Sequence, residues 1–380
     1  MNATEQFNNL SLLYPDADKK RLSSFGGNAS FELGIGAYLA PASTPLECYI
    51  SDDFDTVLYR QETVKDLLSS PEVLRVLAKC VPIIKDIVEL RNLASDSTED
   101  YLCSITEAEL YITLIETLSE GILPERKKLT GRALNALCDR IELLTQSEGY
   151  IKINNSLKEL TSRVRDVKSV CVAINLDGTL KPENAGLVSI NDKKFTFPGA
   201  IERILKIDHS KSETTCIAPL IALDKNASEA EQTAMKIALN SALSSVFKND
   251  FKAWKRIVRT YVLENTDFLI DLLPECEILT KAVEFISSLK ERGVTLTYPV
   301  IVNDNENSFS AIGLVNPVTA MKSDEKMVEN DIEFDENAGI YIVTGPNRGG
   351  KSVLTCAVGD AVIMAQLGLP VCAEKLEMSL

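Results

Sequence analysis

Ile340-Tyr-Ile-Val-Thr-Gly-Pro-Asn-Arg-Gly-Gly-Lys-Ser352 is the stretch that decides the fold of the C-terminal part of this chain. It satisfies the phosphate-loop pattern G-x-x-x-x-G-K-[ST] with Gly345, Gly350, Lys351 and Ser352. The apolar run 340–343 predicts a buried strand, and the pattern over 353–367 predicts a helix. A loop of this kind between a strand and a helix indicates a nucleotide-binding site.

The chemistry of such a loop explains its residue types. Successive backbone N–H groups and the positive end of the following helix surround an anion. Lys351 would add a point charge on the β- and γ-phosphates, and the Ser352 hydroxyl would bind Mg²⁺. The residues expected to contact the nucleotide are Gly345, Pro346, Asn347, Arg348, Gly349, Gly350, Lys351, Ser352 and Val353.

Length and composition narrow the class of protein. The 380 residues suffice for two or more hydrophobic cores, and 45% hydrophobic and 25% charged residues are ordinary for a soluble globular protein. We see no signal peptide and no apolar run of membrane-spanning length, so a cytoplasmic protein without a membrane partner is expected. A single histidine excludes a multi-histidine metal centre, and nine cysteines without a C-x-x-C pair are expected to be reduced.

Charge is unevenly distributed along the chain. The net charge of −15 argues against a protein that wraps nucleic acid over its whole surface. Two segments are nevertheless basic: Arg126–Lys168 has ten Lys/Arg against five Asp/Glu, and Lys248–Arg259 has five against one. Each segment either contacts nucleic-acid phosphates or is the solvated face of a helix, and the second case is the more common one.

Apolar spacing predicts helices over most of the chain as far as residue 291. They are expected at 52–69, 72–93, 110–122, 126–144, 152–167, 228–261, 267–273 and 275–291. Pro82 lies inside the second of these, so a break or kink is expected there. Ser97–Asp100 and Thr106–Glu109 have the composition of helix starts.

A β-containing insertion interrupts the helices. Alternating apolar residues predict strands at 170–175 and 186–190 around a turn at Leu176–Thr179, with a candidate third strand at 217–223. The segment 293–314 is again β-like. The predicted fold class is therefore a mainly α-helical core with a small β-containing insertion, followed by the N-terminal part of a P-loop α/β domain. The expected boundaries are 1–50 for a poorly defined N-terminal segment, 51–292 for the helical region with its insertion at about 169–225, and 293–380 for the start of the P-loop domain.

The wording of the phosphate loop is more specific than the general pattern. Thr-Gly-Pro-Asn-x-Gly-Gly-Lys-Ser at 344–352 resembles the nucleotide-binding loop of the MutS family of DNA mismatch-repair ATPases. That family usually has Met where this chain has Arg348 and Thr where it has Val353. Phe54–Leu68 resembles a helix of the family's core in which an Arg-Gln pair precedes a short apolar run.

Two segments before the loop extend the resemblance. Val315–Val318 and Glu329–Ile332 resemble the family's His-Pro and Pro-Asn-Asp-Ile elements. Asn316 and Glu329 replace the histidine and the proline, at positions where the family contacts or frames the adenine. The resemblance implies ATP or ADP with Mg²⁺ as cofactor, and it adds Asn330 to the residues expected to bind it.

The resemblance also implies a function. It implies a helical core and lever, an ABC-type ATPase domain, and a homodimer that engages DNA and changes conformation with its nucleotide state in DNA repair or recombination control. We expect a member of the family without the mismatch-reading domain that some members carry. The chain also stops before the acid and the partner-completing segment that hydrolysis needs, so we expect a truncated ATPase domain, no hydrolysis by this chain alone, and no catalytic residue.

Two other functions remain open. A nucleotide-regulated helical scaffold that binds a protein or ribonucleoprotein partner is the main alternative, and salt-dependent affinity for DNA would discriminate against it. An unrelated P-loop kinase fits less well, because such kinases usually start near their phosphate loop and here more than three hundred residues precede it.

Overall fold

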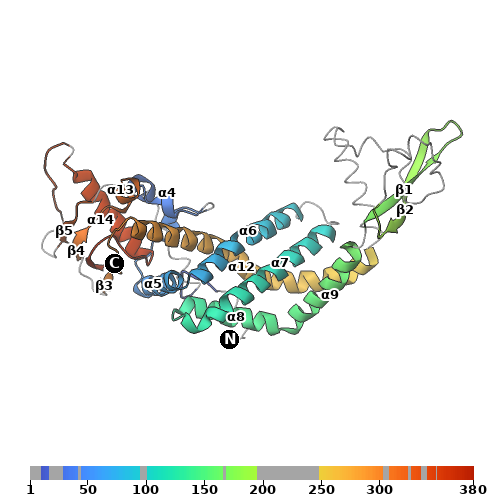
Figure 1. Cartoon of the computed structure of the whole chain (residues 1–380), viewed down its shortest axis with the longest axis horizontal. Coiled ribbons are helices and arrows are strands. Elements are labelled where there is room, and N and C mark those ends of the chain that lie inside the picture. The colour runs from blue at the N-terminus through green and yellow to red at the C-terminus, as the bar shows by residue number, and fades with distance from the viewer. Residues whose placement is uncertain are drawn as a thin grey trace, which may run out of the picture. The chain divides into compact units, whose positions relative to one another are not determined.

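The computed structural model places most of the chain in two compact units. The first unit comprises Met1–Glu89, Leu110–Ser147 and Asn265–Leu380, and the second comprises Leu90–Glu109 and Glu148–Glu264. The structure describes residues 10–16, 29–41, 44–94, 101–165, 168–194, 248–302, 308–323, 327–334, 340–347 and 349–380. The described part is mainly helical with two small sheets (Figure 1), which confirms the predicted helical region with a small β content.

The long helices follow most of the predicted segments. They are α5 (Phe54–Ser69), α6 (Pro71–Ala94), α7 (Tyr101–Ile122), α8 (Arg132–Gln146), α9 (Glu148–Arg165), α12 (Lys248–Glu291) and α14 (Lys351–Gln366). Shorter turns of helix are α3 (Ala29–Leu33), α4 (Gly36–Leu39), η1 (Leu46–Tyr49), η2 (Leu123–Lys128) and α13 (Pro317–Lys322). The helix expected after the phosphate loop is therefore confirmed as α14.

Two prolines lie inside helices that continue past them, so neither proline breaks its helix. α6 runs through Pro82, and α12 runs for 44 residues through Pro274, where three separate helices were expected at 228–261, 267–273 and 275–291. A proline removes one N–H donor from a helix, which costs about 3 kcal/mol. Apolar side chains on both sides of each proline are buried, and this burial outweighs the loss. They are Val73, Leu77, Ile84 and Ile87 in α6, and Phe268, Leu272, Cys276 and Leu279 in α12.

Two predicted helix starts are placed differently. Thr106 lies inside α7, which begins at Tyr101, while Ser97–Asp100 lie outside the described residues. The helix expected from Arg126 begins at Arg132, because Leu123–Lys128 form the 3₁₀ turn η2 with Pro124 near its start. Proline is favoured at the first turn of a helix, where its missing N–H would have no partner.

The second unit carries a two-stranded antiparallel hairpin of β1 (Ser169–Leu176) and β2 (Pro182–Asn191) (Figure 1). Asp177 organises its turn by accepting hydrogen bonds from the N–H groups of Thr179 (2.7 Å) and Lys181 (2.9 Å). These backbone bonds, with the Thr179 hydroxyl, hold the pKa of Asp177 below its usual value. Both predicted strands and the turn are confirmed, and the candidate strand at 217–223 lies outside the described residues.

The first unit contains a four-stranded sheet with strand order β3-β6-β4-β5. The strands are β3 (Val300–Val302), β4 (Phe309–Leu314), β5 (Asn330–Phe334) and β6 (Lys375–Ser379). β6 pairs parallel with β3 and antiparallel with β4, and β4 pairs antiparallel with β5. The β-like segment 293–314 is confirmed by β3 and β4.

The predicted buried strand at 340–343 is wrong. Ile340–Val343 forms extended chain outside the sheet, with Ile340 and Ile342 about 85% and 84% exposed. A central parallel strand is buried only when strands and helices cover it on both sides. No strand among the described residues pairs with this run, so its apolar composition does not lead to burial.

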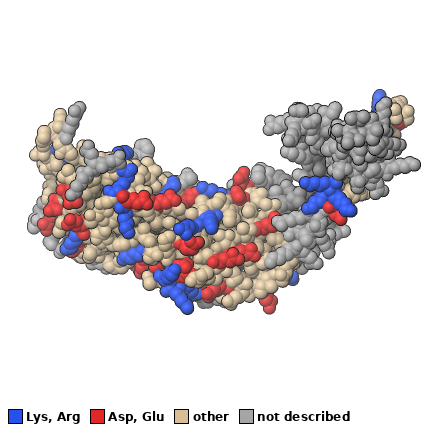
Figure 2. All heavy atoms as spheres, viewed as in Figure 1, with Lys and Arg blue, Asp and Glu red and all other residues tan. Residues whose placement is uncertain are grey.

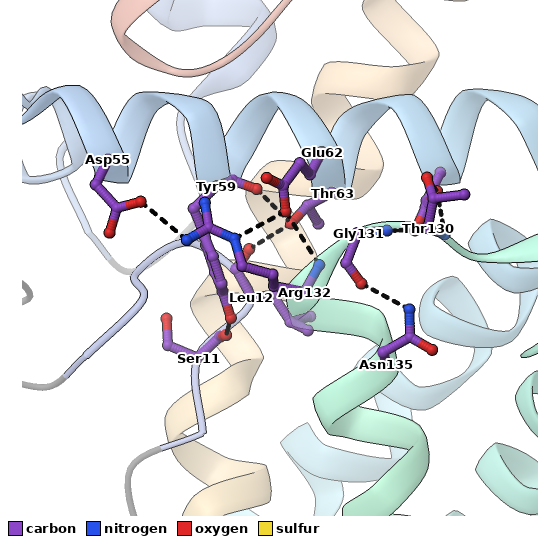
Figure 3. Close-up of polar contacts among 11 residues, drawn as sticks. Ser11, Leu12, Asp55, Tyr59, Glu62, Thr63, Thr130, Gly131, Arg132 and Asn135 are labelled. Atoms are coloured by element: carbon purple, nitrogen blue, oxygen red, sulfur yellow. Dashed lines mark hydrogen bonds and ion pairs between the residues drawn. The ribbon is translucent and has the colours of Figure 1, made fainter.

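α5 holds an N-terminal segment in the core through polar side chains (Figure 3). The Tyr59 hydroxyl donates to the carbonyl of Ser11 (2.8 Å), and the Thr63 hydroxyl donates to that of Leu12 (3.1 Å). From α12, the Glu275 carboxylate accepts from the Leu12 N–H (2.7 Å). The buried segment has no secondary structure of its own, so these side chains satisfy its backbone groups.

α5 also caps another helix. Gly131 precedes α8 and has no side chain to cap it, but the buried Asp66 carboxylate of α5 accepts from the N–H groups of Thr130 (3.0 Å) and Gly131 (2.7 Å). Glu62 accepts from the N–H of Arg132 (3.1 Å). Carboxylates at a helix N-terminus satisfy free N–H groups and oppose the helix dipole. The first turn of α8 is thus fixed by α5.

Two composition-based expectations can be compared with the described residues. Seven cysteines are described, and all seven are free thiols: Cys48, Cys80, Cys138, Cys171, Cys276, Cys356 and Cys372. Burial raises the pKa of Cys80 to about 12, which keeps that thiol neutral. None of the helices in the described part combines the length and apolar character needed to cross a bilayer.

Candidate phosphate-binding site

A cavity of about 700 Å³ adjoins the phosphate loop in the first unit. One wall is the loop itself, and a second is the start of α14 with Lys351, Val353, Leu354 and Ala357. The rest of the wall comes from residues around α13 and the start of β5. These residues are Val315, Asn316, Thr319, Ser323, Met327, Val328 and Asn330.

The loop leads into α14 through a glycine. Gly350 has φ +79°, a left-handed conformation that glycine adopts without strain, and it is the N-cap residue of α14. No side chain caps this helix end. The backbone N–H groups of its first turn therefore lie at the cavity wall without a capping side chain, which is an arrangement that favours an anion.

Lys351 is folded back onto the loop. Its Nζ atom donates to the carbonyl oxygens of Gly345 and Pro346, each at 2.7 Å. The Gly349 N–H donates to the same Pro346 carbonyl at 3.1 Å. The lysine charge therefore already lies inside the curve of the loop, where it can exchange these carbonyls for phosphate oxygens.

The structure brings most of the predicted cofactor residues to one cavity. Seven of them line it, namely Gly345, Pro346, Gly349, Gly350, Lys351, Val353 and Asn330. Asn347 and Ser352 are not among the lining residues, and Arg348 lies outside the described residues. Asn316 lines the cavity, whereas Glu329 lines a neighbouring one of about 180 Å³. These residues therefore share a cavity, and nucleotide binding by them stays a prediction.

The expected magnesium contact depends on Ser352 alone. Ser352 is exposed in the first turn of α14. No group of three or more His, Cys, Asp or Glu side chains in the described part of the chain is arranged to hold a metal ion. A Mg²⁺ ion here would take its remaining ligands from phosphate oxygens and water, which is usual for this ion.

Asp360 is a buried acid beside the site that sequence reasoning missed. It lies in α14, is 0% exposed, and accepts a hydrogen bond from Asn316 Nδ2 at 2.9 Å. Burial raises the pKa of Asp360 to about 7, although the Asn316 bond acts in the opposite direction. A single Asp inside an apolar helical run was the available signal, since a charge there requires a partner.

The other end of α14 is tied to the helical core. The fully buried Arg60 guanidinium donates to the carbonyl oxygens of Gln366 (2.8 Å), Leu13 (3.0 Å) and Tyr49. Gln366 is the last residue of α14, where a positive charge is favourable. Two residues later, Gly368 packs against the backbone of Arg60. The helix that begins at the phosphate loop thus ends on α5.

Several cations at the start of the first basic segment are paired with carboxylates. Arg126 pairs with Asp139 and with Glu142 (2.9 Å), and Arg132 pairs with Asp55 (2.8 Å). On the face drawn in Figure 2, Lys and Arg side chains lie next to Asp and Glu. Cations with carboxylate partners offer little net charge to a polyanion, so this part of the segment behaves as a solvated helix surface.

Comparison with known proteins points to one family. The family described as the MutS2 N-terminal domain matches residues 52–292. An endonuclease MutS2 of Bacillus velezensis is 23% identical over 306 residues, which are 76% of this chain and 35% of that protein. A putative endonuclease MutS2 of Bacillus subtilis is 25% identical over 242 residues, 60% of this chain and 27% of that protein.

A relative with a different name matches a shorter part of the chain. The DNA mismatch repair protein MSH3 of Candida glabrata is 30% identical over 142 residues, which are 37% of this chain and 13% of that protein. In each of these three comparisons the chain spans about a third of its relative's length or less.

Proposed function

The chain belongs to the MutS2 N-terminal domain family within the MutS proteins, and on this premise we propose that its phosphate loop binds ATP or ADP. The observation that carries the proposal is the cavity of about 700 Å³ whose wall includes the loop and the start of α14. Pockets for small ligands commonly measure about 300–1,000 Å³, so the cavity has room for a nucleotide. The loop would be part of an ABC-type ATPase domain.

The residues around the cavity carry the chemical groups that a nucleotide requires. The N–H groups at the start of α14 and Lys351 Nζ would bind the phosphates, while Asn330 would lie nearer the base. Ser352 would bind Mg²⁺, which would neutralise phosphate charge when bound. Asn316 is held by protein partners on both sides of its amide, Thr319 N–H and Asp360, so it shapes the cavity rather than reading the base.

Replacing Lys351 with alanine is expected to weaken ATP binding by about tenfold to a hundredfold. A hydrogen bond from a charged donor contributes about 1.5–3 kcal/mol, and nothing else described in the loop carries a positive charge. Titration calorimetry of the whole chain with ATP measures the change. Lys375→Ala removes an exposed lysine from β6 and is the matched control. Equal ATP affinity in all three proteins would contradict the proposal.

We further propose that the complete protein acts on DNA as a homodimer whose conformation follows its nucleotide state, in DNA repair or recombination control. Support comes from the relatives, which include proteins named as endonucleases and as a DNA mismatch repair protein. The coupling would follow the route from loop to α14 to α5, because Arg60 bonds to the last carbonyl of α14. The basic segment Lys248–Arg259 lies in α12 with a spacing that follows the helical repeat.

DNA affinity of this chain is expected to fall steeply with added salt. Each phosphate neutralised by Lys or Arg releases counterions, and the logarithm of affinity then falls by about 0.9 per contact for each tenfold rise in salt. Binding of duplex and branched DNA between about 50 and 200 mM salt measures the slope. Charge reversal of Lys252 and Lys255 in α12 should reduce it, while reversal of the ion-paired Arg126 should not. A DNA affinity that does not change with salt concentration would instead favour the alternative, a scaffold for a protein or ribonucleoprotein partner.

A further inference from the structure

Asp360 has an unusual environment for an acidic side chain. It is 0% exposed in α14, and only one of its two carboxyl oxygens has a hydrogen bond. Asn316 Nδ2 donates to Oδ2 at 2.9 Å, while Oδ1 has no hydrogen-bond partner among the residues that the structure describes. Burying an ionised carboxylate with so few hydrogen bonds is energetically unfavourable, whereas burying the protonated acid is not.

The hydrogen bond from Asn316 connects Asp360 to the cavity beside the phosphate loop. Asn316 lines this cavity, and its Oδ1 accepts from the Thr319 N–H at 2.7 Å at the start of α13. Ala357, one helical turn before Asp360, lines the same cavity. The Asp360 carboxyl group therefore lies directly behind the cavity wall and fixes the side chain of Asn316 in that wall.

Among the residues that the structure describes, few ionisable groups lie near Asp360. The Cys372 thiol interacts with it, and burial, with a smaller contribution from Asp360, raises the pKa of Cys372 to about 12, so the thiol stays neutral. Arg60 of α5 bonds to the opposite end of α14, at Gln366. Glu32 of α3 and Lys322 of α13 are exposed to solvent. The charge of Asp360 is thus determined mainly by its burial and by Asn316, which together place its pKa at about 7.

We propose that Asp360 is a proton-linked positioning residue of this cavity: it takes up a proton from solvent when a polyphosphate binds at the loop. The inference rests on the proposed nucleotide function and adds to it a dependence on pH. Polyphosphate and carboxylate repel each other across the cavity wall, so the bound anion favours the neutral carboxyl group. Below neutral pH the group is already protonated and binding releases or takes up no proton there.

The direction of the effect follows from linkage. Because the bound state holds the proton more tightly, affinity contributed by Asp360 falls as pH rises through the pKa of the free protein. If binding raises that pKa by about one unit, affinity at high pH is about tenfold lower than at low pH. Screening by water and salt reduces this, so a decrease of roughly threefold to tenfold is expected between pH 6 and 8.5.

The test compares wild type with Asp360→Asn, which keeps the shape and the acceptor for Asn316 but cannot ionise. Inorganic tripolyphosphate and ATP are titrated into each whole chain at about pH 6, 7 and 8.5. The ligands' own protonation is common to both proteins, so only the ratio of the two affinities reports on Asp360. Glu374→Gln removes an exposed carboxylate near the C-terminal strand and is the control for net charge.

We expect wild type and the Glu374→Gln variant to lose affinity relative to Asp360→Asn as pH rises. Calorimetry at about pH 7.5 in two buffers of different ionisation enthalpy should show proton uptake on binding by wild type in excess of that by Asp360→Asn. If the ratio of the wild-type and Asp360→Asn affinities stayed constant at all pH values, the inference would be overturned. The proposed function would survive that result as long as Lys351→Ala still weakened binding.

A stability measurement without ligand distinguishes failure of this inference from failure of the proposed nucleotide function. The folded pKa of Asp360 lies above the usual value for the unfolded chain, so its contribution to stability falls as pH rises from about 4 to about 7 and then stays level. Urea unfolding of wild type should show this fall relative to Asp360→Asn. If the fall is present but no protein binds tripolyphosphate or ATP, the nucleotide function is wrong and proton-linked binding is wrong with it. If the fall is absent, Asp360 holds no proton and the inference is overturned whatever binds.

Discussion

Replacing Arg60 with methionine is expected to lower the free energy of unfolding by about 3–5 kcal/mol. Methionine fills a similar length without a charge, so it removes the cost of burying the guanidinium, a burial that holds the pKa of Arg60 below its usual value. It also leaves the carbonyls of Leu13, Tyr49 and Gln366 without this donor. Each buried acceptor left unsatisfied costs about 1–3 kcal/mol, and three such costs exceed the gain.

Urea unfolding of wild type and the Arg60→Met variant measures this loss. Arg75→Met is the matched control, because Arg75 lies on α6 with a side chain 67% exposed and pairs with Glu72 one turn away. Exposed pairs of this kind contribute little, so the control should lose at most about 0.5 kcal/mol. Comparable losses in the two variants would mean that the carbonyl contacts of Arg60 do not hold the C-terminal end of α14.

Replacing Gly368 with alanine is expected to cost roughly 2–4 kcal/mol, for two independent reasons. Gly368 has φ +74°, which strains any residue with a Cβ atom. A Cβ atom at this position would also lie 2.4 Å from Arg60 Cβ and 2.7 Å from the Arg60 backbone. Backbone atoms of α5 cannot move aside as a flexible side chain would, so the contact between α14 and α5 has to open.

Gly293 offers a control that isolates the second reason. Its φ of +76° is nearly the same, but a Cβ atom there would meet nothing within 4 Å. Gly293→Ala should therefore cost only the backbone strain of about 1 kcal/mol. Thermal or urea unfolding of both variants gives the difference, which measures the close approach of the two segments. Equal costs would show that the Gly368 contact relaxes freely.

The sequence predicted the regular elements well where local pattern decides them. Apolar spacing gave α5, α9 and α14, and alternation gave the β1–β2 hairpin. It failed where burial by distant residues overrides a local signal. Pro82 was expected to break or kink its helix and Pro274 to separate two helices, yet the apolar residues on both sides keep each helix continuous. The run Ile340–Val343 was predicted to be a buried strand but is exposed. Burial of a strand depends on neighbours that its own composition does not specify.

The candidate site shows the same limit. The loop residues are recognisable because the phosphate cradle is encoded within nine consecutive positions. Asp360 was not recognised, since its importance comes from Asn316, which is 44 positions away along the chain. Arg60 stood out as part of an Arg-Gln pair, but its bond to Gln366 spans 306 positions and no local pattern announces it.

α5 has a consequence for how this protein can change over evolutionary time. A helix with one exposed face tolerates neutral substitutions along that face. The buried residues of α5 are Thr56, Val57, Tyr59, Arg60, Gln61, Thr63, Val64, Asp66 and Leu67, which cover more than half of its circumference and leave the face of Leu58, Glu62, Lys65 and Ser69 less buried. Several of them are polar side chains committed to different segments, so no single exchange can be compensated at one neighbouring position. Neutral substitutions are therefore expected to be rare at these buried positions of α5. A change at one of them would need several coordinated mutations to be retained.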